Sequence, residues 1–270
     1  MQRTMSYNGE KGAPQWLGVL PLTEFGFSRH KGAFRDALAL RYGWNPRHVP
    51  SQCACGKRFT VEHAFSCPLG GFPSLRHNDI RDTTACLLSE VCHNVALEPS
   101  LMPLSGERLR HKTTNTEDGA RLDIRAQGFW GERHQSAFFD VRVFNPFAPS
   151  NTNSTPESVY KKHENEKRRN YEERVREVEH GSFIPLVFSA TGGKAATAMY
   201  QRLASLLSVK RTQSYSKTMS WLRCQLTFSL LRSAITCIRG SRSAMNRPGR
   251  SLEINASIPL AASEGRIPGC

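Results

Sequence analysis

Two aspartates stand in the middle of two neighbouring β-like runs, "RLDIR" and "FFDVRV", which a polar segment containing glycine joins. If the connecting turn centres between Gly131 and Glu132, Asp123 and Asp140 lie opposite each other, with Cβ atoms roughly 5 Å apart. Like charges in this position repel each other. A divalent cation would neutralise them, and so would the arginines nearby. The alternative to a metal site is an ordinary solvated face of a sheet.

Strand alternation gives each acid a face. It predicts that Leu122 and Ile124 point to one side and Asp123 to the other. In the second run it places Asp140 on the face opposite to Val141.

The segment 157–180 predicts a long, charged helix with one semi-apolar stripe. That stripe consists of Tyr160, Glu164, Lys167, Tyr171, Val175 and Val178. Lys167 is therefore the lysine of this helix that we expect to point inward, where it needs a negative partner. The strand that carries Asp140 is the preceding element.

Two acids on strands and an inward lysine fit metal-dependent cleavage of phosphodiester bonds. Asp123 and Asp140 would hold Mg²⁺ or Mn²⁺, and Glu98 on the strand before them could add a third carboxylate. Lys167 would orient water or offset charge in the transition state. The competing interpretation is a structural network of ion pairs under a helix.

A compact Cys/His cluster, "CACGKRFTVEHAFSC", predicts a structural zinc site. Cys53, Cys55, His63 and Cys67 follow the spacing C-x-C-x7-H-x3-C, and four such ligands form the closed tetrahedron of a structural site. His63 and Cys67 are four residues apart, which places them on one face of a helix. Gly56 gives the turn its backbone freedom. The alternative is three core cysteines beside a buried histidine.

The chain carries 37 basic residues and 23 acidic ones, a formal net charge of +14. Such an excess indicates a polyanionic partner, usually nucleic acid, although a basic protein without such a partner is the alternative. We find no apolar run long enough for a membrane span and expect no membrane partner. The run "KKHENEKRR" is a candidate nuclear-import signal, but we expect much of it to be ordinary helix surface.

The order of elements predicts an α/β fold in which helices cover a mixed sheet. The expected elements are helices at 31–42, 76–94, 157–180, 195–210 and 215–238, and strands at 95–99, within 119–144, and at 182–193. The expected organisation is a disordered leader (1–14), a helix with the zinc knuckle (15–72), a catalytic core (73–212), a C-terminal helix (213–239) and a disordered basic tail (240–270).

Over residues 15–210 this order of motifs resembles a known family. The zinc knuckle, "RHND", "RLDI", "FFDVRV" and "EKRRNY" resemble the restriction-like endonuclease tail of non-long-terminal-repeat retrotransposons, a branch of the PD-(D/E)XK nuclease superfamily. Asp123 matches the aspartate of the "PD" motif, with Leu122 in place of the proline, and Asp140 matches the second acid. Lys167 and Tyr171 match a lysine that has migrated to the helix ahead of a tyrosine.

The resemblance implies a PD-(D/E)XK core and a nickase that cuts target DNA so that reverse transcription can begin. In it Arg142 takes the position of the strand lysine, and Arg168 competes with Lys167 for its role. The implied partners are DNA, the element's RNA, and a reverse transcriptase domain of the parent polyprotein. The implied location is the nucleus, otherwise the cytoplasm.

A second function is a catalytically inactive zinc-knuckle protein that binds nucleic acid, derived from the same kind of element. Arg76, His77 and Asn78 of "RHND", and the basic run that contains Arg168, would contact phosphates in either case. Charge alone does not separate the two functions. The segment "SATGGKAATA" lacks the spacing of a phosphate-binding P-loop, and we expect a plain strand-to-helix turn there.

Overall fold

The computed structural model describes residues 4, 6, 7, 9, 15–20, 23, 27–192 and 197–240. Its elements are η1 (Gln15–Gly18), α2 (Lys31–Tyr42), α3 (Val61–Ser66), α4 (Phe72–Ser89), β1 (His93–Leu97), β2 (Ile124–Gln127), β3 (Ser136–Phe144), η3 (Pro149–Asn151), α5 (Pro156–Glu177), β4 (Ser182–Ser189), α6 (Thr197–Lys210) and α7 (Tyr215–Arg239). The predicted leader and basic tail lie almost wholly outside the described residues, as does most of the turn before α6.

The four strands form one mixed sheet in the order β1-β2-β3-β4. β1 and β2 are antiparallel, and so are β2 and β3, whereas β3 and β4 are parallel. Ile124 pairs with Phe139 and Gln127 with Ser136. These pairs centre the hairpin between residues 131 and 132, so the predicted register is confirmed.

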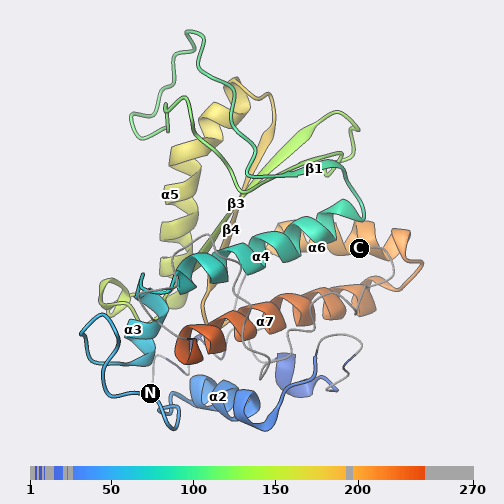
Figure 1. Cartoon of the computed structure of the whole chain (residues 1–270). Helices are drawn as coiled ribbons and strands as arrows, with labels where there is room; N and C mark the ends of the chain where they lie inside the picture. Colours follow the sequence, from blue (N-terminus) through green and yellow to red (C-terminus); the bar gives the residue numbers. More distant parts are fainter. Residues whose placement is uncertain are drawn as a thin grey trace.

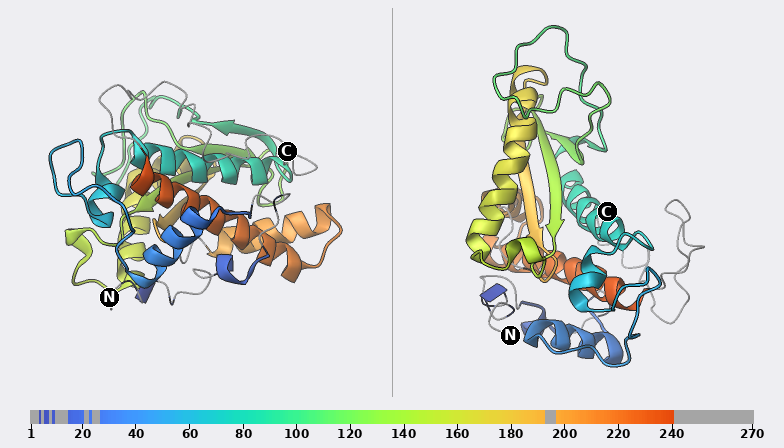
Figure 2. Two further views of the ribbon diagram at one scale, coloured as in Figure 1. Left: turned by 60° about the horizontal axis from the view of Figure 1, so that its bottom comes forward. Right: turned by 90° about the vertical axis from the view of Figure 1, so that its left-hand side faces the viewer.

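Helices cover both faces of the sheet, which confirms a mixed α/β architecture (Figure 1). On one face, Ile80 and Leu88 of α4 and Leu203 of α6 share a buried apolar cluster with Phe139 of β3. The other face is covered by α5, and the right-hand view of Figure 2 shows α5 and α4 on opposite sides of the strands. Outside α4 and α6 lies α7, and α2 packs against α7 on the side away from the sheet.

Two helix boundaries show how local chemistry sets the elements. The predicted helix 31–42 is observed at these bounds, because the side chain of His30 accepts hydrogen bonds at its start and Gly43 ends it with φ 68°. The prediction of a helix at 76–94 was wrong at both ends. Gly71 turns the chain with φ 69°, and a proline in the first turn lets α4 begin at Phe72. At its other end β1 has already begun at His93.

The chain bends at Asp123, and this overturns the prediction that Leu122 and Ile124 share a face. Leu122 packs with Phe138 on the α5 side of the sheet, whereas Ile124 packs with Phe139 on the α4 side. The carboxylate of Asp123 accepts a hydrogen bond from the backbone N–H of Val141 at 2.5 Å. A side chain therefore replaces a main-chain acceptor here, and strict alternation ends.

None of the helices in the described part of the chain has the length and apolarity that a membrane crossing requires.

Candidate functional site

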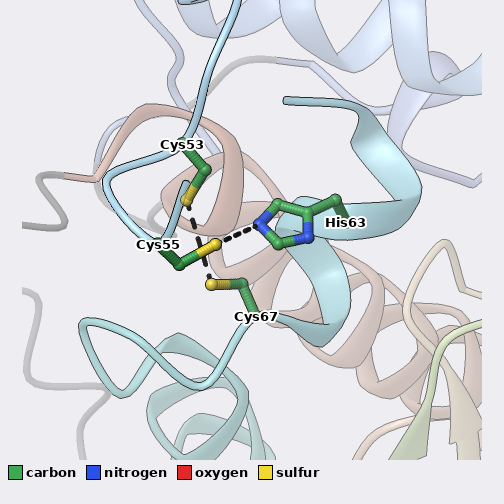
Figure 3. Close-up of side chains that lie close together, drawn as sticks. All are labelled: Cys53, Cys55, His63 and Cys67. Atoms are coloured by element: carbon green, nitrogen blue, oxygen red, sulfur yellow. Dashed lines mark hydrogen bonds between the residues drawn. The ribbon is translucent and has the colours of Figure 1, made fainter. Parts of the chain in front are cut away.

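The Cys/His cluster assembles four potential metal ligands from α3 and the residues that flank it (Figure 3). The ligand atoms of Cys53, Cys55, His63 and Cys67 all lie within 4.8 Å of one another. The two sulfurs of Cys53 and Cys67 are 3.9 Å apart, and Cys55 Sγ is 3.2 Å from His63 Nε2. Ligands at tetrahedral angles around zinc lie roughly 3.5–3.8 Å from one another. The cluster could therefore bind a zinc ion, as its spacing predicts.

Local hydrogen bonds build this cluster. Cys53 donates its N–H to the carbonyl of Lys57 at 2.8 Å, which closes the turn that Gly56 enters with φ 85°. The hydroxyl of Thr60 accepts the N–H of His63 at 3.0 Å and thereby caps α3. Burial and the neighbouring sulfurs raise the pKa of the Cys67 thiol, whereas a backbone hydrogen bond from Lys57 lowers the pKa of Cys55. A bound cation would hold Cys67 as a thiolate.

The second assembly joins both predicted acids to the predicted lysine. Lys167 Nζ of α5 lies 2.6 Å from Asp140 Oδ2 of β3. Asp123 lies next to Asp140, since its carboxylate accepts the N–H of Val141, the residue after Asp140, and the two acids affect each other's pKa. Asp123 also contacts Nε2 of His77, on α4, at 2.9 Å. The helices on the two faces of the sheet, α4 and α5, therefore each contact one of the two carboxylates.

The two carboxylates differ in acidity. Burial raises the pKa of Asp140 to about 7, and the charge of Asp123 adds to this effect while Lys167 opposes it. Burial also acts to raise the pKa of Asp123, but the hydrogen bond and charge of His77 and the N–H of Val141 outweigh it and lower that pKa. One acid of the pair is thus held ionised, and the other titrates near neutral pH.

The side chains around Lys167 hold it in place. Its ammonium lies 5.9 Å from the centre of the Tyr171 ring, and that ring packs against Phe183 of β4 at 6.0 Å. Lys167 is largely buried, with 17% of its side chain exposed. The inward orientation predicted for Lys167 is confirmed, and Tyr171 lies directly beneath it.

Arg142 is on the same face of β3 as Asp140, but it does not contact either aspartate in the described interactions. Its guanidinium pairs with Glu166 of α5 at 3.2 Å. Glu166 also lies 3.6 Å from the Nδ1 atom of His163. This ion pair therefore flanks the acid–lysine assembly.

The structure does not bring Glu98 into the acid pair. Its side chain is exposed and forms an ion pair with Arg81, while its backbone N–H binds the carbonyl of Asp123 at 2.9 Å. Among the described residues, the Cys/His cluster is the one set of three or more ligand atoms within 4.8 Å. The third carboxylate that the sequence suggested is thus held elsewhere by an arginine.

The residues predicted to contact phosphates differ in their burial and in their partners. Arg76 is 3% exposed, and its guanidinium donates to the carbonyls of Phe65 at 3.2 Å and Val143 at 3.4 Å. The prediction that Arg76 binds nucleic acid was wrong, because the side chain is buried and hydrogen-bonded inside the protein. Asn78 is half-buried, and Arg168 is exposed and pairs with Glu172 on its own helix.

Sequence reasoning missed three buried polar residues of α5. His163 is 8% exposed, Glu173 5% and Arg174 0%. Arg174 donates to the carbonyls of Met102, Asn115 and Glu117, and Glu173 accepts backbone N–H groups of Arg110 and His111. Helical spacing places His163 and Arg174 at the edge of the apolar stripe, and that was the available signal. Glu173 lies outside the stripe, and the loop at Arg110 and His111 covers it.

No family model and no curated protein matches this chain.

Proposed function

We propose that the chain is a metal-dependent DNA endonuclease, a nickase of retrotransposon origin with a PD-(D/E)XK core. The observation that carries the proposal is the placement of Asp140 between Asp123 and Lys167, 2.6 Å from the ammonium group. A buried acid with its pKa raised to about 7, beside a second acid and a lysine, is typical of a site that handles charge. The mixed sheet with helices on both faces is consistent with such a core.

The donor set fits Mg²⁺ or Mn²⁺. Asp123 and Asp140 offer hard carboxylate oxygens at one point, and Mg²⁺ commonly takes one or two carboxylates and keeps its other positions for water and phosphate. Burial raises the pKa of Asp140, and the charge of Asp123 adds a smaller contribution; a bound cation would offset both effects. When bound, the ion would polarise the scissile phosphate and acidify a water molecule.

The chain's own groups have separate roles in this proposal. Lys167 would hold the nucleophilic water or offset charge on the phosphate in the transition state. The ring of Tyr171, whose centre lies 5.9 Å from Lys167 Nζ, would help to position the ammonium group. Arg142 would position α5 against β3 through Glu166, at 3.2 Å, instead of acting as the strand lysine of the resembled family.

The Cys/His cluster would hold a structural zinc ion, since its four protein ligands leave no open coordination position for substrate. The net charge of +14 favours DNA, or the RNA of the parent element, as the polyanionic partner. Association with a reverse transcriptase and a nuclear location belong to the same proposal.

Nicking of supercoiled plasmid in Mg²⁺ or Mn²⁺ tests the proposal. The variants are Asp140→Asn and Lys167→Met, and Lys210→Met, an exposed lysine at the end of α6, is the matched control. We expect the wild type and Lys210→Met to convert plasmid to open circles at equal rates. The two site variants should be slower by at least about 100-fold, since removing one group that stabilises the transition state typically costs that much.

Equal cleavage by all four proteins would refute the site. If none of them cleaves while all bind DNA, the chain is the inactive nucleic-acid-binding protein instead. The pairing of Arg142 with Glu166 favours that second function, because it removes a cation from the position where the resembled family has its strand lysine.

A further inference from the structure

The end of α2 exposes two stacked aromatic rings to solvent. Tyr42 and Trp44 are 37% and 58% exposed. Their ring centroids are 4.8 Å apart, and the ring planes meet at 25°. Large aromatic side chains are usually buried, so an exposed stacked pair indicates a binding surface.

The backbone fixes the two rings. Gly43 ends α2 with φ 68°, a left-handed conformation that suits glycine. The N–H of Trp44 then donates to the carbonyl of Ala39 at 2.8 Å. The chain therefore reverses within one residue and places the indole beside the phenol, so the surface is preformed.

The stretch of sequence that carries this pair is strongly basic. Residues 31–58 contain six lysines and arginines and one acid, Asp36. Asp36 is buried and is neutralised by Arg239 at 2.6 and 2.7 Å. The exposed basic residues of this stretch are Lys31, Arg35, Arg47, Lys57 and Arg58. The guanidinium of Arg41 lies 5.8 Å from the centre of the Tyr42 ring.

We propose that the Tyr42–Trp44 pair binds single-stranded nucleic acid by stacking on an unpaired base. Flat aromatic faces bind bases of any sequence, and cations along the same surface neutralise the phosphates. In a duplex the bases already stack on one another, so the surface discriminates for single strands. DNA and RNA share this chemistry. The site lies on α2 and the loop that leads to the zinc cluster, and it does not depend on the acid–lysine assembly.

Fluorescence anisotropy with labelled dT20, rU20 and a 20-base-pair duplex tests the proposal. The variants are Trp44→Leu and Tyr42→Leu, and Trp130→Leu is the matched control, since Trp130 is an exposed tryptophan at 44% on the distant β2–β3 hairpin. We expect Trp44→Leu to weaken binding of the single strands by roughly 5- to 150-fold, the range of one lost base stack. The affinity of Trp44→Leu for the duplex and the salt dependence of that affinity should equal those of the wild type. Trp130→Leu should bind the single strands as the wild type does.

Circular dichroism establishes that each variant is folded, and Tyr42→Leu serves as the second arm if Trp44→Leu unfolds. Equal affinity of wild type and both ring variants for dT20 and rU20 would overturn the proposal. An equal loss on single strands and duplex would overturn it too. The ratio of the dT20 and rU20 affinities identifies which strand the site prefers. Plasmid nicking tests the acid–lysine assembly and anisotropy with Trp44→Leu tests the stacking site, so a failed nuclease and a failed stacking site give different results.

Discussion

The buried carboxyl of Asp140 should make the stability of the metal-free protein fall as pH rises. Its pKa is raised from 3.8 to about 7, with burial as the main cause, and 8% of the side chain is exposed. A shift of about three units corresponds to about 4 kcal/mol between the two protonation states. Asp140→Asn keeps the shape of the side chain and removes the titration.

The sign follows from proton binding in the two states. Above about pH 4 the unfolded chain has released the proton of Asp140, whereas the native protein keeps it until about pH 7. The native state therefore binds the extra proton in this window, and its stabilisation is lost as pH rises. Between pH 4.5 and 8 the wild type should lose about 3 kcal/mol of unfolding free energy relative to Asp140→Asn.

Urea denaturation in a chelating buffer at several pH values measures this difference. Subtracting the Asp140→Asn curve removes the contribution of other titrating groups that are independent of Asp140. A difference that stays flat, or that grows in favour of the wild type as pH rises, would refute a neutral, buried Asp140. In the same assay at pH 8, Mg²⁺ at 100 times its Kd should restore about 2.7 kcal/mol to the wild type and less to the variant.

Three further substitutions test the structural interpretation. Cys67→Ser should reduce bound zinc from about one ion per chain to near zero, by metal analysis, and lower Tm; Cys92→Ser, at a buried cysteine outside the cluster, should keep the zinc. Arg174→Met should cost about 3 kcal/mol or more in urea unfolding, because three loop carbonyls lose their donor; the exposed Arg176→Met should change stability by less than about 0.5 kcal/mol. Arg76→Met should cost about 2 kcal/mol yet leave the salt dependence of DNA affinity unchanged, because the side chain is buried.

The predictable parts of the site follow from short-range rules. The zinc ligands lie within 15 residues of one another, so their spacing alone describes a local tetrahedron. The pairs of β2 and β3 centre their hairpin between residues 131 and 132, and the same symmetry brings Asp123 near Asp140 although the ladder itself stops at Ile124 and Phe139. Lys167 was found from helical periodicity, because α5 has one stripe that can pack on the sheet.

The errors share a different origin. Arg76 was interpreted as surface charge, yet it lies four residues before Ile80 on the stripe that α4 buries. A basic residue on an apolar stripe predicts an internal hydrogen-bonding role, and periodicity should have outweighed charge. The bend at Asp123 has no signal in the sequence, because it depends on a contact with Val141, 18 residues away.

Two of these side chains complete the sheet where β2 begins. The chain pairs with β3 only from Ile124, opposite Phe139, so residues 140–144 of β3 pair with β4 alone. On the open side, Asp123 accepts the N–H of Val141 and Arg76 donates to the carbonyl of Val143. Side chains thus protect an exposed edge that backbone would otherwise leave unpaired.

This arrangement gives Asp123 a structural role and places it beside Asp140 at the same time. Removing Asp123 would leave a buried N–H without an acceptor, and the cost of that loss would obscure any effect on catalysis. Asp140 and Lys167 form an ion pair with each other at 2.6 Å, and their backbone hydrogen bonds do not depend on either side chain. Substitutions at Asp140 and Lys167 therefore separate chemistry from folding, and a loss of nicking in folded Lys167→Met protein would have to come from the site itself.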